Sequence, residues 1–247
     1  MECPICKGKT FVRDSEEDAW KPCECRIKKD TEDLLDLKIK NTFIPKHYTK
    51  YTLESYKKLV RPDDLEKNQE QLMIMEKIVD NPRLFLDNYR VLWIWGSDSN
   101  SGHTTFAVMA GLALIDSGYK VRFVEMQALV NNFTNFDTKE QFFGDLSRYD
   151  VYIIDDAFDS TRTAVSDGYG RVQLFQFINS AFNNDKYFIM TSNIPLNSIS
   201  STDDNKYEQC RIILQRSILS LEFSGTLFLD NTKDVFKDVT KIKRTPI

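Results

Sequence analysis

Residues Arg90–Ala113 read RVLWIWGSDSNSGHTTFAVMAGLA, and the rest of the chain is organised around them. It opens with five apolar residues, Val91–Trp95, which predict a short buried strand. A polar loop bounded by two glycines comes next. The segment Phe106–Ile115 is apolar, too long for one strand and rich in helix formers, so it predicts a helix with Thr104 at its start. The stretch therefore predicts a strand, a glycine-bounded loop and a helix, in that order.

This succession is the layout of a phosphate-binding P-loop. In such a loop, backbone N–H groups and the helix N-terminus converge on phosphate, and a Thr hydroxyl at the helix start reaches Mg²⁺. The same Thr104 is therefore a candidate magnesium ligand. An ordinary strand–helix turn is the alternative that the loop by itself leaves open. The candidate nucleotide-binding residues are Gly96, Ser101, Gly102, His103, Thr104 and Thr105.

The loop departs from the usual pattern G-x-x-x-x-G-K-[ST] in two ways. Five residues rather than four separate Gly96 from Gly102, and His103 stands where the pattern has lysine. Lysine brings a permanent charge to the β- and γ-phosphates, whereas a free imidazole, with a pKa of about 6.5, is mostly neutral at pH 7. We therefore expect the backbone groups to bind nucleotide, with hydrolysis weak or lost.

A second apolar run, Val151–Ile154, is followed directly by two carboxylates, Asp155 and Asp156. This pattern resembles a Walker B strand, since a buried parallel strand carries its acids to the carboxyl edge of the sheet, where ligands bind. Asp155 would hold Mg²⁺ and Asp156 would polarise the attacking water. A strand that ends in a polar turn is the plainer alternative.

A further strand is predicted at 186–193, and it ends in polar residues. Asn193 at its tip resembles the sensor 1 position, where an amide holds the water near the γ-phosphate. Asn193 and Asp156 are therefore the candidate catalytic residues within one chain.

Four of the five cysteines lie in the first 25 residues, as a C-x-x-C pair and, sixteen residues later, a C-x-C pair. Four sulfurs satisfy tetrahedral Zn²⁺ and leave no open position for catalysis, so the pattern predicts a structural site. The N-terminus has no signal-peptide pattern, and a reducing cytosol favours metal over disulfides. Free cysteines or redox chemistry are the alternatives. The predicted zinc ligands are Cys3, Cys6, Cys23 and Cys25.

The composition sets outer limits on size and partners. A length of 247 residues suggests one large domain, or a medium domain with an appendage, and 41% hydrophobic residues suffice for a core. No apolar run reaches the eighteen or so residues of a membrane span, so we expect no membrane partner. The net charge of −4 argues against a wholly basic nucleic-acid coat. Local basic patches remain, at Arg26, Lys28, Lys29, Lys241, Lys243 and Arg244.

The chain is expected to have four parts. The linker part should contain a helix over Asp30–Lys40, where leucines recur at helical spacing, and another over Leu65–Val79. The expected parts are a zinc module at 1–30, linker helices at 31–82, an ATPase core at 83–230 and a basic tail at 231–247.

The order of these parts resembles the AAA+ replicative helicase loaders of the DnaC/DnaI type and the related transposition helper IstB. The resemblance covers nearly the whole chain, and many phage-encoded loaders have this layout, so a phage origin is one expectation. It rests on the cysteine knuckle that ends in CEC and on the stretches IPKHYTKYTLESY, KVRFVE, YIIDD, MTSN and RIILQRSILSLEFSG.

The resemblance implies an α/β core with a central parallel five-stranded sheet, in the order 5-1-4-3-2 when the P-loop strand is counted first. It implies ATP, Mg²⁺ and Zn²⁺ as cofactors and the bacterial cytoplasm as location. Its implied partners are a hexameric replicative helicase, held by the N-terminal domain, and single-stranded DNA. It also implies self-association, with an arginine from one protomer at the nucleotide of the next. Arg216 is favoured for that role over Arg211, and an exposed helix face is the plainer explanation of either.

The chain departs from the family after Gly225, where TLFLD carries no sensor 2 arginine. Together with His103, this departure favours weak or lost hydrolysis. The leading hypothesis is an ATP-regulated helicase loader. The alternatives are a catalytically inactive AAA+ adaptor that recruits or sequesters helicase, and an IstB-like transposition helper, which the cysteine knuckle disfavours.

Overall fold

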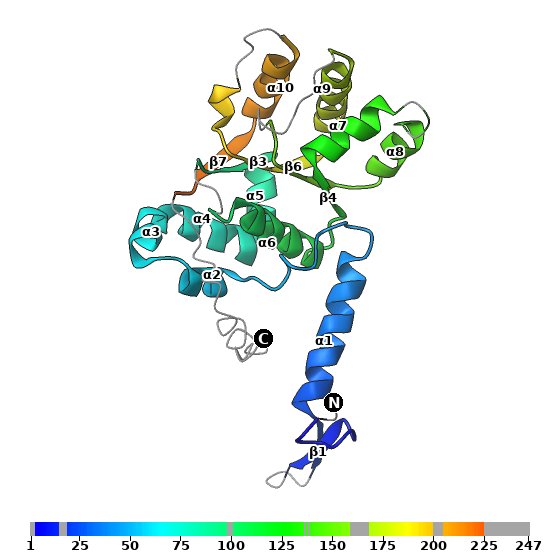
Figure 1. Ribbon diagram of the computed structural model, residues 1–247, viewed down its shortest axis with the longest axis vertical. Helices are drawn as coiled ribbons and strands as arrows, with labels where there is room; N and C mark the ends of the chain where they lie inside the picture. The colour runs from blue at the N-terminus through cyan, green and yellow to red at the C-terminus, as the bar shows by residue number, and fades with distance from the viewer. Residues whose placement is uncertain are drawn as a thin grey trace. The chain divides into compact units, whose positions relative to one another are not determined.

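The computed structural model describes residues 3–14, 19–97, 101–135, 137, 139–158, 168–199 and 205–224. The chain divides into two compact units, Met1–Asn41 and Thr42–Ile247 (Figure 1). The expected basic tail and the segment after Ser224 lie outside the described residues. Within the part of the chain that the structure describes, no helix is both long and apolar enough to cross a membrane.

The N-terminal unit contains an antiparallel hairpin of β1 (Phe11–Asp14) and β2 (Ala19–Pro22), followed by helix α1 (Glu24–Ile39). The hairpin was not predicted. The helix expected at Asp30 begins six residues earlier, because the Cys23 carbonyl, just past the hairpin, already accepts the first helical hydrogen bonds. The C-x-C pair is therefore divided between the end of the hairpin and the first turn of α1.

The second unit is built on a five-stranded sheet in which every neighbouring pair is parallel. The strands lie in the order β4 (Val121–Glu125), β5 (Val151–Asp155), β6 (Tyr187–Ser192), β3 (Val91–Trp95) and β7 (Ile218–Glu222). Counted from β3 as the first strand, this is the order 5-1-4-3-2. The expected α/β class and strand order are confirmed.

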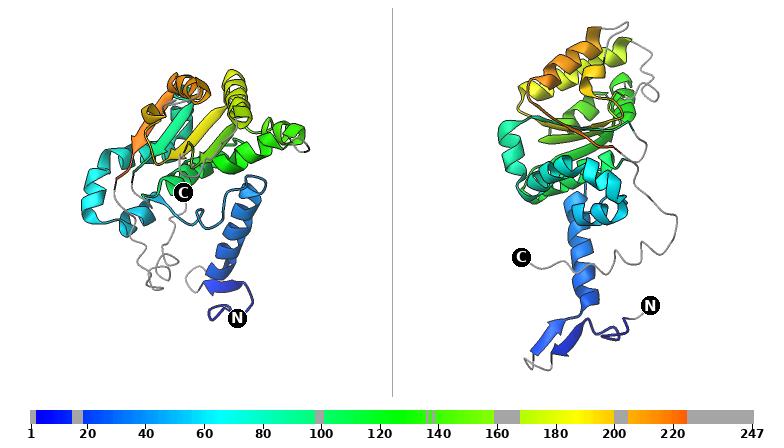
Figure 2. Two further views of the ribbon diagram at one scale, coloured as in Figure 1. Left: turned by 45° about the horizontal axis from the view of Figure 1, so that its top comes forward. Right: turned by 90° about the vertical axis from the view of Figure 1, so that its left-hand side faces the viewer.

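Helices cover both faces of the sheet, which explains why its central strands are apolar on both sides (Figure 2). Along β3, Val91 and Trp93 belong to one buried cluster, while Leu92 and Ile94 belong to the other. This alternation is the two-residue period of a strand. On the Leu92 face lie α4 (Gln69–Asp80), α5 (Pro82–Asn88) and α6 (His103–Asp116). On the other lie α7 (Met126–Thr134), α8 (Lys139–Leu146), α9 (Gly168–Asn183), η1 (Leu196–Ser198) and α10 (Asn205–Gln215).

The helices before the sheet differ from the prediction at one point. The single helix expected over Leu65–Val79 is two helices, α3 (Pro62–Lys67) and α4, which meet at Asn68. The Asn68 side chain donates to the carbonyls of Asp64 and Ser224 and accepts from the Ser224 N–H. It is buried by these contacts, so a tertiary hydrogen-bond set, invisible in the apolar spacing, breaks the helix.

Candidate nucleotide and metal site

The predicted loop joins the end of β3 to the start of α6. The structure explains why glycine stands at each of its two ends. The Gly96 N–H donates to the carbonyl of Ser192, at 3.2 Å. A Cβ at Gly96 would lie 2.3 Å from the Phe223 carbonyl oxygen and 2.9 Å from the Ser101 hydroxyl. Gly102 precedes α6 with a φ of 88°, in the left-handed region that glycine tolerates. Residues 98–100 of the loop lie outside the described residues.

A hydroxyl from the start of α6 meets the acid at the end of β5. Thr104 Oγ1 donates to Asp155 Oδ1 at 2.9 Å, although the two residues lie far apart in the sequence. Thr191 on β6 donates to the same oxygen, at 2.5 Å. Parallel pairing explains this, since Ile154 on β5 lies opposite Met190 on β6, and the next residue of each strand is Asp155 and Thr191. Thr191 was not among the predicted site residues.

The Asp155 carboxyl is buried and therefore poorly hydrated. Burial raises its pKa from 3.8 to about 6, although the hydroxyls of Thr191 and Thr104 act in the opposite direction. An ionised carboxylate that has lost its water is stabilised by a cation. Hydroxyl and carboxylate oxygens suit Mg²⁺, so Thr104 and Asp155 fit the metal site expected from the sequence.

His103 begins α6, and its ring is buried. Its Nδ1 lies 2.9 Å from the hydroxyl of Ser101. Burial lowers the pKa of His103 below 6.5, although the charge of Asp156 opposes the shift. The imidazole is therefore neutral at pH 7, and it does not replace the cation that lysine supplies in other P-loops. Thr105, two residues after His103, is also buried.

The two other candidate catalytic residues lie just beyond strand ends. Asp156 follows β5 with a left-handed φ of 53°, and its N–H donates to the hydroxyl of Thr191 at 3.0 Å. Asn193 follows β6 directly. The side chain of Thr191, two residues before Asn193, contacts the Asp155 carboxylate.

The two candidate arginines differ in their surroundings. Arg211 lies in α10, where its guanidinium donates to Gln215 and Glu208 of the same helix, at 3.0 Å each. Arg216 follows the end of α10, is exposed, and forms no ion pair with any residue that the structure describes. Arg216 is therefore the one whose charge is available to another molecule.

Two tyrosines that precede the core lie near this site, and neither was predicted. The Tyr56 hydroxyl donates to the Ser101 carbonyl at 3.3 Å, and burial, helped by the charge of Asp155, raises the pKa of Tyr48. Both belong to the stretch IPKHYTKYTLESY. The only sequence signal was this density of tyrosines before the loop, and it carries no spacing rule that points to phosphate.

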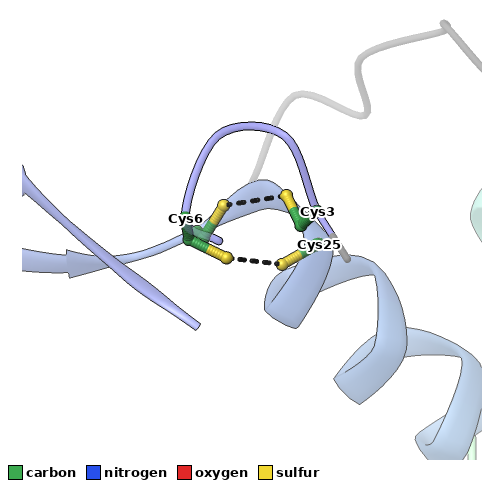
Figure 3. Close-up of side chains that lie close together, drawn as sticks. Cys3, Cys6 and Cys25 are labelled. Atoms are coloured by element: carbon green, nitrogen blue, oxygen red, sulfur yellow. Dashed lines mark hydrogen bonds between the residues drawn. The ribbon is translucent and has the colours of Figure 1, made fainter. Parts of the chain in front are cut away.

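A separate site lies in the N-terminal unit, where the four predicted cysteines come together (Figure 3). All four sulfurs lie within 4.8 Å of one another, with Cys3–Cys23 at 3.9 Å and Cys6–Cys25 at 3.5 Å. Zn–S bonds of about 2.3 Å in a tetrahedron put sulfurs about 3.8 Å apart, so the spacing fits zinc. It is far longer than a disulfide bond of about 2.05 Å.

The backbone around the cluster has the form of a knuckle. Lys7 and Gly8 have φ values of 45° and 81°, and the Lys7 N–H donates to the Cys3 carbonyl at 2.9 Å. The backbone N–H groups of Cys6 and Ile5 lower the pKa of the Cys3 thiol to about 7, whereas the Cys6 thiol and burial raise the pKa of Cys25 to about 12. Metal binds the thiolate form, which at neutral pH is favoured at Cys3.

No protein-family model and no curated protein matches this sequence. Among solved structures, a DnaC helicase loader matches with a TM-score of 0.55 and 18% identity over 73% of this chain and 100% of its own. The structure of DnaI matches with a TM-score of 0.55 and 13% identity over 75% of this chain and 94% of its own. The replication initiator DnaA, bound to AMPPCP and single-stranded DNA, matches with a TM-score of 0.53 and 17% identity over 76% of this chain.

The aligned region is 55% of the DnaA chain, so this protein spans about half of that relative. At these low identities the likeness concerns the fold. The parallel sheet, its strand order and the strand–loop–helix unit at its centre agree with that likeness. The core of this chain therefore has the same fold as the DnaC and DnaI structures and as the aligned part of DnaA.

Proposed function

We propose that this protein is an ATP-regulated assembly factor of the helicase-loader kind, which acts on a hexameric replicative helicase during DNA replication. The observation that carries the proposal is the hydrogen-bonded cluster of Thr104, Asp155 and Thr191. Thr104 directly follows the glycine-bounded loop, and the fold is similar to that of a DnaC helicase loader. A buried carboxylate with two hydroxyl donors, at the carboxyl edge of a parallel sheet, has the position and chemistry of a metal–phosphate site.

Each candidate residue has a role in this proposal. The loop N–H groups and the start of α6 bind phosphate, with Gly96 and Gly102 allowing the backbone to approach it. Thr104 and Asp155 hold Mg²⁺, which neutralises phosphate charge when it is bound. Asp156 orients the attacking water, and Asn193 or Thr191 helps to hold it. Arg216 reaches the nucleotide of a neighbouring protomer, with Arg211 as the alternative.

The other parts follow from the same proposal. The zinc module at 1–30 and the helices at 31–82 bind the helicase, and the core at 83–230 binds ATP, single-stranded DNA and other protomers. Two of the similar structures support this proposal. DnaC is a helicase loader, and the replication initiator DnaA is bound to single-stranded DNA. A bacterial cytoplasm, as in an infected host, is the proposed location.

A second function is favoured by one specific observation, the neutral and buried His103. A protein that binds ATP without a fixed cation on the transferring phosphate could act as an adaptor that recruits or sequesters helicase without turnover. The two functions share the fold and both partners. They differ in whether ATP hydrolysis accompanies release of the helicase.

The test is capture of a purified hexameric replicative helicase on the immobilised full-length protein, without nucleotide, with ATP and with AMPPCP. A loader should retain helicase with AMPPCP and release it over time with ATP. An adaptor should retain it equally with both. The matched variant Asp155→Asn, which removes the metal-binding charge, should remove any difference between nucleotides. Failure to bind any helicase hexamer would contradict both functions.

A further inference from the structure

The last peptide of the glycine-bounded loop is held by a residue of helix α2 (Leu53–Leu59), which precedes the core. The Tyr56 hydroxyl donates to the Ser101 carbonyl at 3.3 Å, although the two residues lie 45 positions apart in the sequence. Tyr56 is 3% exposed and Ser101 is 1% exposed, so water has little access to this hydrogen bond. Burial raises the pKa of Tyr56, and the phenol therefore remains a donor at any working pH.

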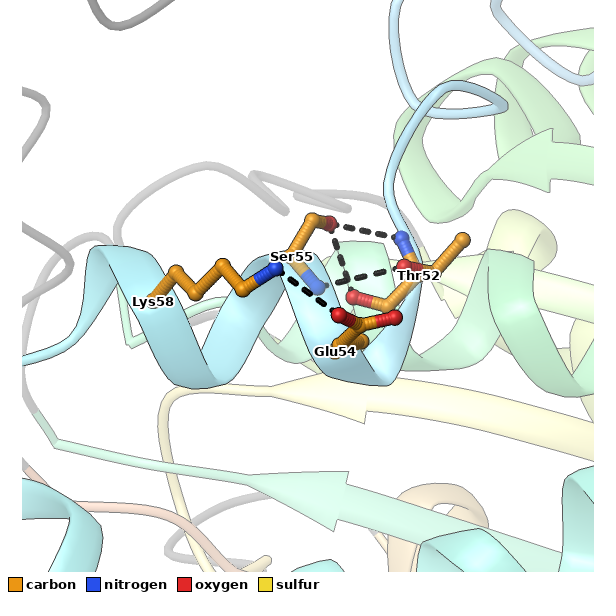
Figure 4. A network of polar contacts seen from close by, with 4 residues as sticks. All are labelled: Thr52, Glu54, Ser55 and Lys58. Atoms are coloured by element: carbon orange, nitrogen blue, oxygen red, sulfur yellow. Dashed lines mark hydrogen bonds and ion pairs between the residues drawn. The ribbon is translucent and has the colours of Figure 1, made fainter. Parts of the chain in front are cut away.

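The position of Tyr56 is fixed by the start of α2, which has a reciprocal cap (Figure 4). The Thr52 hydroxyl accepts from the Ser55 N–H at 3.1 Å, and the Ser55 hydroxyl accepts from the Thr52 N–H at 2.8 Å. The Tyr56 N–H donates to the Thr52 carbonyl at 2.9 Å, so Tyr56 lies in the first turn. An exposed ion pair of Lys58 with Glu54 adds little on the outer face. The cap therefore determines where the Tyr56 side chain leaves the helix.

The ring of Tyr56 is fixed by the core. It lies 4.4 Å from the ring of Phe106 in α6, the helix into which the loop leads. Phe106 in turn stacks on Phe223, which follows β7, at 4.1 Å. All three rings belong to the buried cluster on the Leu92 face of the sheet. The reach of the hydroxyl to the loop is therefore set by packing and not by a freely rotating side chain.

The Ser101 side chain is also held, whereas the residue after it is permissive. The Ser101 hydroxyl lies 2.9 Å from His103 Nδ1, and a Cβ at Gly96 would lie 2.9 Å from the same oxygen. Gly102, which follows, has φ 88° and ψ 9°. Since glycine accepts many backbone angles, the peptide between Ser101 and Gly102 can rotate at little cost. Of the residues that the structure describes, Tyr56 is the one that donates to the Ser101 carbonyl.

The orientation of this peptide decides what the loop presents to an anion. In a trans peptide the C=O and N–H groups point in opposite directions, so the Gly102 N–H points away from Tyr56. The N–H groups of Gly102, His103 and Thr104 have no acceptor among the described residues. A left-handed residue followed by helical ones directs successive N–H groups to one side, which suits an anion. A rotated peptide would present the Ser101 carbonyl oxygen instead, and that oxygen repels phosphate.

We propose that Tyr56 is a positioning residue for nucleotide binding, whose hydroxyl holds the Ser101–Gly102 peptide with the Gly102 N–H directed toward a bound phosphate. This inference rests on the proposed function, since it requires nucleotide binding at this loop. Tyr56 acts through Ser101 and does not touch the nucleotide. It raises the fraction of protein whose loop is ready to bind, so its effect precedes the arrival of the nucleotide.

The test measures the binding of Mg–mant-ADP, a fluorescent ADP, by stopped flow with full-length wild type, Tyr56→Phe and Tyr152→Phe. Tyr56→Phe keeps the ring and removes the donor. It should lower the association rate constant about three- to tenfold, the effect of one neutral hydrogen bond on the loop equilibrium. The dissociation rate constant should change less than about twofold, because bound phosphate itself holds the peptide.

Tyr152→Phe is the matched control. The Tyr152 hydroxyl is also buried and also donates to a backbone carbonyl, that of Leu146 at 2.8 Å, but Tyr152 belongs to the cluster on the other face of the sheet. Both of its rate constants should stay within about 1.5-fold of wild type. A merely structural role of Tyr56 would lower the stability of both variants alike and leave both sets of rates unchanged.

A second variant tests the same link from the surface, without altering a buried ring. Thr52→Ala removes the cap hydroxyl at an exposed position outside the loop. It should lower the association rate constant less than Tyr56→Phe does. Added to Tyr56→Phe it should cause no further loss, because both changes act through the bond to Ser101. A further loss in the double variant would overturn this route.

Three other results would overturn the inference, and they separate it from the proposed function. Wild-type rates in Tyr56→Phe would show that the hydroxyl only stabilises the fold, and the proposed function would stand. Faster dissociation with unchanged association would show that the loop has this orientation without Tyr56. No binding of Mg–mant-ADP by wild type would refute nucleotide binding itself, and the role of Tyr56 with it.

Discussion

At the residue scale, His103 is the position where this site differs most from a common P-loop. Burial keeps its imidazole neutral, and its hydrogen bond to Ser101 keeps the ring within the loop. The phosphate-binding N–H groups of the loop and the hydroxyl of Thr104 do not depend on the charge of His103. We therefore expect nucleotide binding to be largely preserved while the transferring phosphate lacks a fixed cation.

We predict that His103→Lys raises ATP turnover by about two to three orders of magnitude, the usual effect of one electrostatic group in a transition state. His103→Gln, which stays neutral, should leave turnover near that of wild type. Steady-state hydrolysis at pH 7.5 measures both. Because the pKa of His103 lies below 6.5, lowering the pH from 8 to 6.5 should not raise the rate. A large loss of activity in His103→Gln would mean that the imidazole itself acts in hydrolysis.

Asp155 allows a prediction about stability with a defined sign. Its pKa is 3.8 when unfolded and about 6 when folded, so between these values the folded protein binds the proton more tightly. Stability from this group is therefore greatest at low pH and is lost as pH rises toward 6. In metal-free protein, Asp155→Asn should raise the free energy of unfolding at pH 7.5 by about 1–3 kcal/mol, since two pKa units equal roughly 3 kcal/mol.

Urea unfolding at pH 7.5 and pH 4.5 measures this effect, and the gain should shrink at the lower pH. Asp156→Asn is the matched control, because asparagine tolerates the same left-handed backbone and the side chain is less buried. Its effect should be less than about 0.5 kcal/mol. Equal stability of Asp155→Asn and wild type at pH 7.5 would show that the folded carboxylate is not desolvated.

At the element scale, Asn68 joins two helices to the end of a strand. Its amide bonds to the Asp64 carbonyl between α3 and α4, and to both backbone groups of Ser224 just after β7. Because the residue is buried, its removal leaves these backbone groups without partners or water.

We predict that Asn68→Ala lowers the free energy of unfolding by about 2–3 kcal/mol, because unsatisfied buried polar groups cost about 1–3 kcal/mol. Asn88→Ala is the control, since the Asn88 amide also bonds a helical carbonyl, that of Leu84, but at an exposed position. Its effect should stay within about 0.5 kcal/mol. Chemical denaturation measures both, and similar small losses in the two variants would refute the structural role of Asn68.

At the scale of the whole molecule, the two units should differ in what stabilises them. The N-terminal unit has a small hairpin and one helix, with Ile27, Leu34 and Leu37 of that helix more than half exposed. Such a unit buries little apolar surface, so metal binding has to supply its folding energy. The second unit has two buried clusters on its sheet and does not depend on the metal.

We predict one Zn²⁺ per chain, measured by elemental analysis of protein purified without chelators. Cys23→Ser should lose the metal, unfold the N-terminal unit and abolish helicase binding, while the second unit keeps its cooperative unfolding. Cys210→Ala is the control, because Cys210 lies in α10 and is not one of the four clustered cysteines, so its variant should retain one equivalent. Wild-type protein with well below one equivalent would contradict the zinc assignment.

Charge allows a second prediction at this scale, concerning DNA. The chain has a net charge of −4, and α7, which follows β4, contains no basic residue, so single-strand binding should be modest and salt-sensitive. Replacing Lys241, Lys243 and Arg244 with alanine should lower affinity and reduce the salt slope by up to about two. Fluorescence anisotropy with a dT oligonucleotide between 50 and 300 mM salt measures this. Affinity independent of salt would contradict the electrostatic basis of binding.

Several parts of this protein could be predicted from residue type and local spacing. Val91–Trp95 with its glycine-bounded loop, the two acids after Val151–Ile154 and the paired cysteines are all written within short stretches, where residue type and interval set the chemistry. The fold class and the strand order followed from the family resemblance and not from spacing.

Which distant side chains share a site could be learned only from the folded chain. Thr191 reaches Asp155 because β5 and β6 are neighbours, and Tyr56 of helix α2 (Leu53–Leu59) reaches the Ser101 carbonyl because it packs into the core. Asn68 interrupts a predicted helix because its side chain hydrogen-bonds to Ser224, more than 150 residues later in the sequence. A threonine, tyrosine or asparagine has many possible hydrogen-bond partners. Its spacing in the chain selects none of them, so contact in the folded protein is what assigns its role.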